Sequence, residues 1–172
     1  TEPTACAAGT QEAVTALVQQ ASDALNDAAD ENPMLAGMGC TAVGLVVQPN
    51  AEVLVFNVGD SRCYRVEGRY LAQLSVDHRE PASGALTQAL GGGRRMVLQP
   101  DYFSCSLPAD QGLILCTDGL DDYASFADIE ARALRGGPGL VAGLRDLALA
   151  GKGGDNVSIV QVSLIDGGAD HG

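Results

Sequence analysis

Four short β-strand patterns follow one another between residues 41 and 74 at the spacing of β-hairpins. Each covers six or seven residues, and turn residues such as Pro49-Asn50 and Glu67-Gly68 separate them. Parallel pairing would need a long crossover between neighbouring strands, so this spacing predicts an antiparallel meander rather than βαβ units. The four predicted strands are 41–47, 52–57, 62–67 and 69–74.

Helical patterns lie on either side of the meander. Residues 10–30 carry apolar side chains at intervals of three and four, the period of an amphipathic helix, and Asn32-Pro33 predicts its end. Further helices are expected at 82–90, 126–134 and 140–150. The apolar positions of the first helix are Val14, Leu17, Val18, Ala21, Leu25 and Ala28.

Three more strands complete the prediction, at 101–107, 112–117 and 156–164. The order is helix, antiparallel strands, helices and a final strand, which predicts an α+β sandwich. A length of 172 residues suits one domain with a sizeable core, and the sequence has no repeat or linker. We therefore expect residues 1–172 to form a single domain whose tail, 166–172, is disordered.

Composition excludes several kinds of partner. A net charge of −12 argues against nucleic acid, because phosphate binding needs a basic face. No apolar run approaches the roughly 20 residues of a membrane span, so no membrane partner is expected. Five cysteines form no CxxC pair, which fits a reducing compartment and predicts a cytoplasmic location.

Acidic motifs lie next to three of the apolar runs. Asp60 follows the strand at 52–57, Asp118 and Asp122 follow the strand at 112–117, and Asp155 precedes the last strand. If these strand ends converge, the carboxylates share one cleft and repel one another unless protons or cations neutralise them. Divalent cations with oxygen ligands would satisfy such a cluster.

Simpler roles are open for the same residues. Asp-Gly and Gly-Asp are common turn pairs, which would explain Asp118 and Asp155, and Asp60 could cap its own turn. Asp122 could favour the dipole of a helix N-terminus. For the neighbouring residues we expect His78 to anchor a loop, Asp121 to be solvated and Arg62 to hold the Asp60 loop.

Read together and in order, the motifs resemble those of the metal-dependent protein phosphatases of type 2C, above all the compact bacterial members. The resemblance runs unbroken over residues 37–164. Each motif alone is weak, whereas all of them in sequence order are specific. They are Met38-Gly39-Cys40-Thr41-Ala42, Asn57-Val58-Gly59-Asp60-Ser61-Arg62, Asp77-His78, Thr87-Gln88-Ala89-Leu90-Gly91, Thr117-Asp118-Gly119-Leu120-Asp121-Asp122 and Gly153-Gly154-Asp155-Asn156.

The resemblance implies a four-layer α-β-β-α sandwich of two antiparallel sheets. It implies a binuclear Mn²⁺ or Mg²⁺ centre with Asp118 and Asp155 among its ligands. Asp60 and Asp122 match positions that hold a third ion in many members. Supporting roles fall to Asn156, Gly119 and Arg62.

The implied reaction is hydrolysis of phosphoserine or phosphothreonine monoesters by a metal-activated water. The implied substrate is a phosphoprotein that a serine/threonine kinase has phosphorylated, and the expected state is a monomer.

Two motifs of the family have no match before Met38: an acidic metal-binding strand pair and an Asp-Gly-x-x-Gly motif whose aspartate bridges both metals. We therefore expect a family domain without its first strands, and weak activity from these 172 residues alone. The alternative is a catalytically inactive regulatory or phosphoprotein-binding module. Retention of all four aspartates favours the enzyme.

Overall fold

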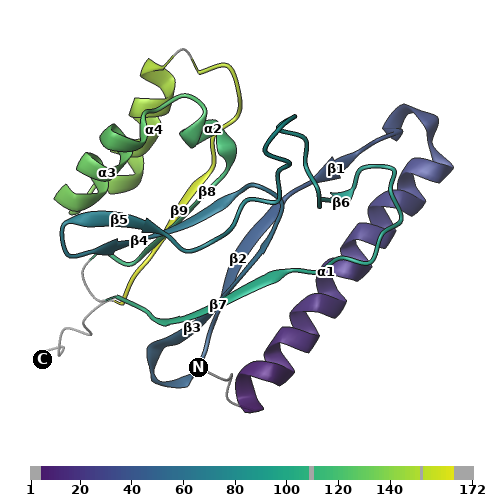
Figure 1. The fold of residues 1–172 in the computed structure, drawn as a ribbon, viewed down its shortest axis with the longest axis horizontal. Coiled ribbons are helices and arrows are strands. Elements are labelled where there is room, and N and C mark those ends of the chain that lie inside the picture. The colour runs from purple at the N-terminus through teal and green to yellow at the C-terminus, as the bar shows by residue number, and fades with distance from the viewer. Residues whose placement is uncertain (1–4, 109–110, 152, 165–172) are drawn as a thin grey trace, which may run out of the picture. The chain divides into compact units, whose positions relative to one another are not determined.

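The structure is a computed structural model that describes residues 5–108, 111–151 and 153–164. The expected disorder of 166–172 lies outside these residues. Helices and strands follow closely the order that the sequence predicts (Figure 1). The elements are α1 (Ala5–Glu31), η1 (Pro33–Leu35), β1 (Gly39–Cys40), β2 (Ala42–Val47), η2 (Pro49–Ala51), β3 (Glu52–Val58), β4 (Arg62–Glu67), β5 (Tyr70–Gln73), β6 (Leu90–Gly91), β7 (Asp101–Ser106), β8 (Leu113–Cys116), α2 (Asp118–Asp121), α3 (Phe126–Arg135), α4 (Leu140–Ala150) and β9 (Ile159–Val162).

Two compact units make up the chain, and their segments alternate along the sequence. Unit 1 contains the chain up to residue 46 together with 54–62 and 75–104. Unit 2 contains 47–53, 63–74 and the chain from 105 onwards. The divisions therefore fall inside strands β2, β3 and β7 and near the first residue of β4.

The described strands form three sheets. One has the order β5-β4-β8-β9, a second has β2-β3-β7, and a short one joins β1 to β6. The pairs β4/β5, β8/β9 and β1/β6 are antiparallel. This confirms the α+β class, while the stacking of the two larger sheets stays a prediction.

Helix α1 covers an apolar cluster in unit 1. Val14 and Val18 are buried with Val58, Leu90 and Leu98. The buried face of α1 continues through polar residues Ser22 and Asn26, whereas Leu17 of the expected apolar face is 63% exposed. The buried face of α1 is therefore rotated slightly from the predicted apolar face. Ser22 and Asn26 can be buried because they form hydrogen bonds within unit 1. Their partners are the N–H of Gly91 for Ser22 and the carbonyl of Arg94 for Asn26.

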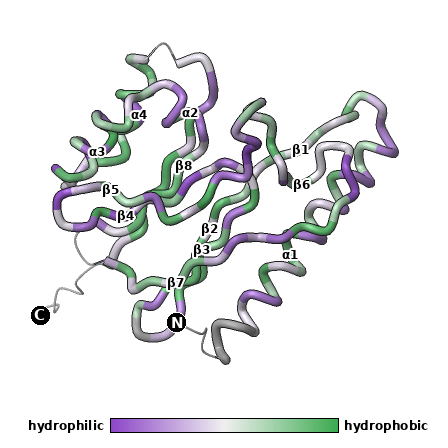
Figure 2. The backbone as a smooth tube through the Cα atoms, in the orientation of Figure 1, coloured by the Kyte–Doolittle hydropathy of each residue, from purple (hydrophilic) through white to green (hydrophobic). Residues whose placement is uncertain are grey.

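A separate apolar cluster fills unit 2. Helices α3 and α4 lie side by side against the four-stranded sheet (Figure 1), and the tube in Figure 2 is mostly hydrophobic along β8 and α4. Helix α4 and strand β4 have the bounds that the sequence predicts. The buried members of this cluster are Tyr64, Leu71, Ile114, Cys116, Leu120, Ile129, Ala133, Leu140, Leu144 and Ala148.

The helix predicted at 82–90 is wrong. Here the chain forms a tight hairpin in which Arg79 pairs with Leu86 as an antiparallel bridge. The N–H of Glu80 donates to the carbonyl of Ala85 at 2.9 Å, and Gly84 takes a φ of +69°, which favours glycine. Pro81 begins the turn, and its fixed φ favours that position in a β-turn.

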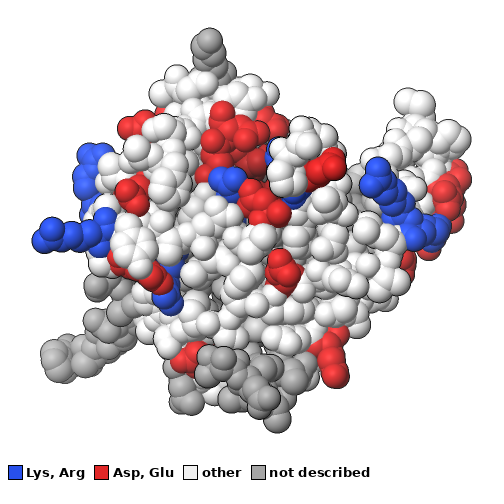
Figure 3. Space-filling view, in the orientation of Figure 1, with Lys and Arg blue, Asp and Glu red and all other residues white. Residues whose placement is uncertain are grey.

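None of the described helices is long and apolar enough to cross a membrane. On the face drawn in Figure 3, acidic side chains are spread more widely than basic ones, as the net charge of −12 leads one to expect.

Candidate functional site

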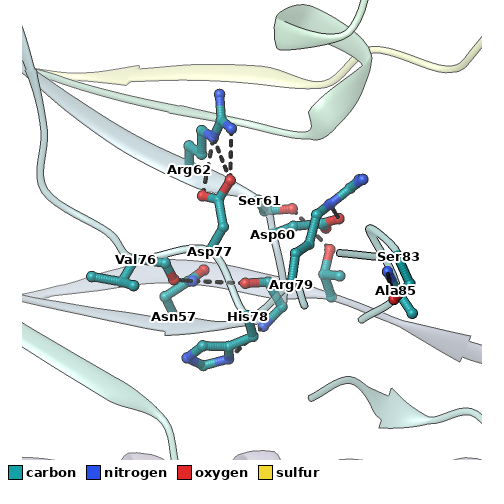
Figure 4. A network of polar contacts seen from close by, with 12 residues as sticks. Asn57, Asp60, Ser61, Arg62, Val76, Asp77, His78, Arg79, Ser83 and Ala85 are labelled. Atoms are coloured by element: carbon teal, nitrogen blue, oxygen red, sulfur yellow. Dashed lines mark hydrogen bonds and ion pairs between the residues drawn. The ribbon is translucent and has the colours of Figure 1, made fainter. Parts of the chain in front are cut away.

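In unit 1, Asp60 lies in a tight turn directly after β3. Gly59 precedes it with a φ of +106°, and a Cβ at Gly59 would overlap the side chain of Thr41, so only glycine fits there. The Asp60 side chain is 5% exposed and forms an ion pair with Arg79 (Figure 4). A buried carboxylate needs such a partner, because removing it from water without one is costly.

His78 anchors this turn, as the sequence predicts. Its ring atom Nδ1 accepts a hydrogen bond from the backbone N–H of Gly59 at 3.1 Å. The backbone N–H of His78 donates to the carbonyl of Gly59 at 2.9 Å. Because Nδ1 accepts, the ring proton is assigned to Nε2, which lies 3.1 Å from Oδ2 of Asp101. The side-chain amide nitrogen of Asn57 also donates a hydrogen bond to the Gly59 carbonyl, at 3.0 Å. The backbone before Asp60 is therefore held from several directions.

Arg62 binds Asp77, whereas the sequence predicts that it holds the Asp60 loop. Its guanidinium holds Asp77 through both carboxylate oxygens, at 2.6–3.1 Å, and Asp77 precedes His78 (Figure 4). The Asp60 carboxylate instead binds Arg79, a residue that the sequence reasoning missed. The only hint in the sequence was its place directly after the Asp77-His78 pair.

In unit 2, Asp118 is the first residue of the short helix α2, immediately after β8. Its side chain is partly exposed. Asp122 is the residue after this helix, its N–H donates to the carbonyl of Asp118 at 2.8 Å, and its side chain is exposed. The helix-start role considered for Asp122 is therefore wrong, since it caps the C-terminal end of α2.

The Asp155 segment lies against the Asp118 segment. A Cβ on Gly119 would overlap the carbonyl oxygen of Asn156, so the two backbones touch. The N–H of Thr117 also donates to the carbonyl of Ser158 at 3.1 Å, and the N–H of Ser158 donates to the Thr117 hydroxyl at 3.0 Å. Unit 2 thus brings together two acidic motifs that lie far apart in the sequence.

Asp155 itself is exposed, and its carboxylate accepts the backbone N–H of Asn156 at 2.7 Å. The role of Asn156 in supporting a metal ligand stays a prediction. Asp121, in contrast, is not solvated as expected. It accepts from the hydroxyl of Tyr64 at 2.5 Å and from the thiol of Cys116 at 3.5 Å, which fastens α2 to the sheet.

The donor chemistry at α2 suits a divalent cation, because Asp118 and Asp155 supply hard carboxylate oxygens on adjoining segments. No group of three or more His, Cys, Asp or Glu side chains among the described residues is arranged to hold a metal ion. Asp60 belongs to unit 1, and the convergence of all four aspartates stays a prediction.

Comparison with known proteins places these features in a family. The family described as Protein phosphatase 2C matches residues 3–139. A serine/threonine protein phosphatase, PstP, of Mycobacterium tuberculosis is 28% identical over 170 residues, covering 88% of this chain and 32% of that protein. The serine/threonine phosphatase stp of Listeria monocytogenes is 29% identical over 114 residues, covering 56% of this chain and 44% of that protein.

Solved structures agree with the sequence relatives. The serine/threonine phosphatase Stp1 from Staphylococcus aureus matches 91% of this chain and 68% of its own, with a TM-score of 0.77 and 26% identity. A bacterial serine phosphatase matches 83% of this chain and 64% of its own, with a TM-score of 0.71 and 28% identity. The chain spans less than half the length of the two sequence relatives named above. With most of its residues matched by the family, the chain belongs to the protein phosphatase 2C family.

Proposed function

We propose that this chain is the catalytic domain of a metal-dependent phosphatase that hydrolyses phosphoserine and phosphothreonine monoesters in proteins. The observation that carries the proposal is the contact between the Asp118 and Asp155 segments, which Gly119 makes possible. An aspartate whose only role is to form a turn would not require a second acidic segment in contact with its own. The relatives named as serine/threonine phosphatases support the reaction class.

Asp118 and Asp155 would hold a Mn²⁺ or Mg²⁺ ion of a binuclear centre, with Asp122 as a candidate for a further ion. When bound, two such ions supply charge that lowers the pKa of water and neutralises phosphoryl oxygens. The protein contributes orientation: the Asn156 N–H fixes one oxygen of Asp155, and the bonds from Tyr64 and Cys116 to Asp121 hold α2 in place. Support of this kind limits the movement of carboxylates that bind a metal.

The substrate we propose is a phosphoprotein, phosphorylated by a serine/threonine kinase, and the proposed state is a monomer in the cytoplasm. Cys63 and Cys116 are buried, and buried thiols that pack as small apolar side chains suit a reducing compartment. Burial raises the pKa of the Cys63 thiol to about 12, so this thiol stays protonated and unreactive at neutral pH. The alternative of an inactive binding module finds no support in the named relatives.

The metal site can be tested by thermal unfolding. Mn²⁺ at about 100 times its Kd should stabilise the chain by about 2.7 kcal/mol, which raises Tm by roughly 5–10 °C for a domain of this size. Asp155→Asn should remove that shift. Asp146→Asn is the matched control, because it removes the same charge from an exposed position on α4 that pairs with Arg145. An equal shift in Asp155→Asn would place the cation elsewhere.

Activity is the second test. We expect the 172 residues alone to hydrolyse para-nitrophenyl phosphate or a phosphothreonine peptide barely above background, because one weakly held ion cannot both activate water and hold the phosphoryl group. A polypeptide extended at its N-terminus by the strand pair and the Asp-Gly-x-x-Gly motif should show Mn²⁺-dependent turnover that Asp118→Ala abolishes. Strong activity of the short chain, or an inactive extended one, would contradict this account.

A further inference from the structure

Three arginines of unit 2 lack the carboxylate partner that most arginines of this protein have. Within the described part of the chain, Arg69, Arg132 and Arg135 form no ion pair. Their lack of partners is unexpected, because 22 Asp and Glu residues stand against 10 Lys and Arg residues in the sequence. The arginines that do pair with an aspartate or a glutamate are Arg62, Arg65, Arg79, Arg95 and Arg145.

Helix α3 runs along strand β5 in the opposite direction. At the start of the helix, the ring of Phe126 lies 6.3 Å from that of Tyr64, and Tyr64 pairs with Gln73 of β5. One helical turn later, the carboxylate of Glu130 accepts the N–H of Leu71 at 2.8 Å. The C-terminal end of α3 therefore points toward the turn that joins β4 to β5.

This direction brings the three arginines to one end of unit 2. From Glu130 to Arg135 the helix advances about 7.5 Å, and from Leu71 to Arg69 the strand covers about 6.8 Å. Arg135 and the turn residue Arg69 thus reach the same level, with Arg132 one helical turn before the end of α3. Figure 3 shows basic side chains projecting at the left edge, where Figure 1 places α3 and β5.

Backbone contacts orient two of these side chains. Nε of Arg135 donates to the carbonyl of Ala131 at 3.1 Å, and Nη1 of Arg132 donates to the carbonyl of Gly136 at 3.0 Å. Each guanidinium has five N–H donors, so most of its donors stay available for a ligand. Arg69 and Arg135 are exposed, whereas Arg132 is half-buried.

The carboxylates nearest in the sequence do not neutralise this end of unit 2. Glu67 is held by the guanidinium of Arg65 and by the hydroxyl of Tyr70. Glu130 is held by the N–H of Leu71. Cations in the last turn of a helix favour its dipole, which accounts for arginines at the end of α3 but not for Arg69 in a turn.

We infer that Arg69, Arg132 and Arg135 form a docking surface for an acidic segment of a protein substrate. The inference rests on the proposed function in taking a phosphoprotein as the substrate. Guanidinium groups suit such a segment, because their planar N–H donors bind carboxylates and phosphates in pairs. A protein with a net charge of −12 repels acidic segments over most of its surface, so this surface sets where one can approach.

Fluorescence anisotropy on the 172-residue protein tests the docking surface. The probe is a labelled phosphothreonine peptide flanked by glutamates, and the comparison is the same peptide with glutamines in their place. In EDTA and at low ionic strength, the glutamate peptide should bind about fivefold tighter or more, and Arg69→Gln/Arg135→Gln should lose this gain. Added salt should weaken binding of the glutamate peptide to the wild type.

Arg94→Gln/Arg95→Gln is the matched control, because it removes the same charges from exposed positions of unit 1. It should leave Kd within about twofold of the wild type. Arg69→Lys/Arg135→Lys keeps the charges and should retain part of the affinity. If the double glutamine variant does not fold, Arg69→Gln carries the test, since Arg69 lies in a turn and should still weaken binding by about twofold or more.

Backbone amide shifts in NMR spectra locate the peptide. They should change most in the β4–β5 turn and at the C-terminal end of α3. The inference is overturned if both peptides bind equally, if the control loses as much affinity, or if the shifts lie elsewhere. It is also overturned if the substitutions lower Tm without changing Kd, or if phosphatidylglycerol vesicles bind more tightly than the peptide through the same arginines.

These measurements need neither a metal ion nor turnover, so they stand apart from the test of the proposed function. Failure of that function is read from Asp155→Asn and from the extended polypeptide. An inactive extended polypeptide that still binds the glutamate peptide through Arg69 and Arg135 would contradict the phosphatase proposal and leave the docking surface in place.

Discussion

At the scale of single residues, the sequence identified the acidic positions but not all of their partners. Asp60 lies in the turn after β3, Asp118 begins α2 after β8, and Asp155 lies in the bend that precedes β9. The contacts of Asp60 with Arg79 and of Asp121 with Tyr64 join residues that are 19 and 57 positions apart. Local patterns of hydropathy and turn chemistry contain no information on such pairs, because they depend on how the chain folds back on itself.

The backbone contact between Gly119 and Asn156 leads to a prediction at this scale. Gly119→Ala should destabilise the protein by about 1–3 kcal/mol, because its Cβ would push the Asn156 backbone away. The same displacement should reduce the Tm shift caused by Mn²⁺, since Asp155 moves with Asn156. Calorimetric melting curves with and without Mn²⁺ measure both effects.

Gly9→Ala serves as the control for that substitution. Gly9 lies in α1, and a Cβ there meets nothing within 4 Å. It should leave the Mn²⁺ shift intact and raise stability by up to about 1 kcal/mol, the usual gain from alanine within a helix. A Gly119→Ala protein that keeps both its Tm and its Mn²⁺ shift would show that the close approach is unimportant.

At the scale of elements, strongly periodic or strand-like segments were predictable and irregular ones were not. The bounds of α4 and β4 agree with the sequence prediction. The segment at 82–90 was misread as helical because its composition outweighed Pro81 and Gly84, the residues that mark its turn. Two-residue strands such as β1 and β6 have no periodicity to detect, so only tertiary pairing defines them.

Helix α3 allows a prediction at this scale. Its N-cap is Ser125, whose hydroxyl accepts the N–H of Asp128 at 3.2 Å and donates to the Asp128 carboxylate at 2.6 Å. Ser125→Ala should therefore reduce the free energy of unfolding by about 1 kcal/mol, or about 2–4 °C in Tm. Ser104→Ala, at an exposed position of β7, is the control and should change Tm by less. Equal effects of the two substitutions in thermal melts would argue against the cap.

At the scale of the whole molecule, the two units share strands β2, β3 and β7 and should unfold together. Leu144→Ala in unit 2 and Leu98→Ala in unit 1 each remove a fully or nearly fully buried side chain. Each should lower stability by about 2–5 kcal/mol. We expect a single calorimetric transition that moves down in both variants. A scan that splits into two transitions in either variant would show that the units melt independently.

The alternation of segments also has a consequence for synthesis on the ribosome. Strand β3 carries Val53, Leu54 and Val55, which are almost completely buried in the finished protein. Unit 1 is complete only once residue 104 has emerged, and the last strand of unit 2 ends at Val162. The ribosome needs roughly 5–20 s to extend the chain from Val58 to Val162, at about 5–20 residues per second. During that interval β3 lacks part of its final cover, so the nascent chain should be a substrate for chaperones that bind short apolar strands.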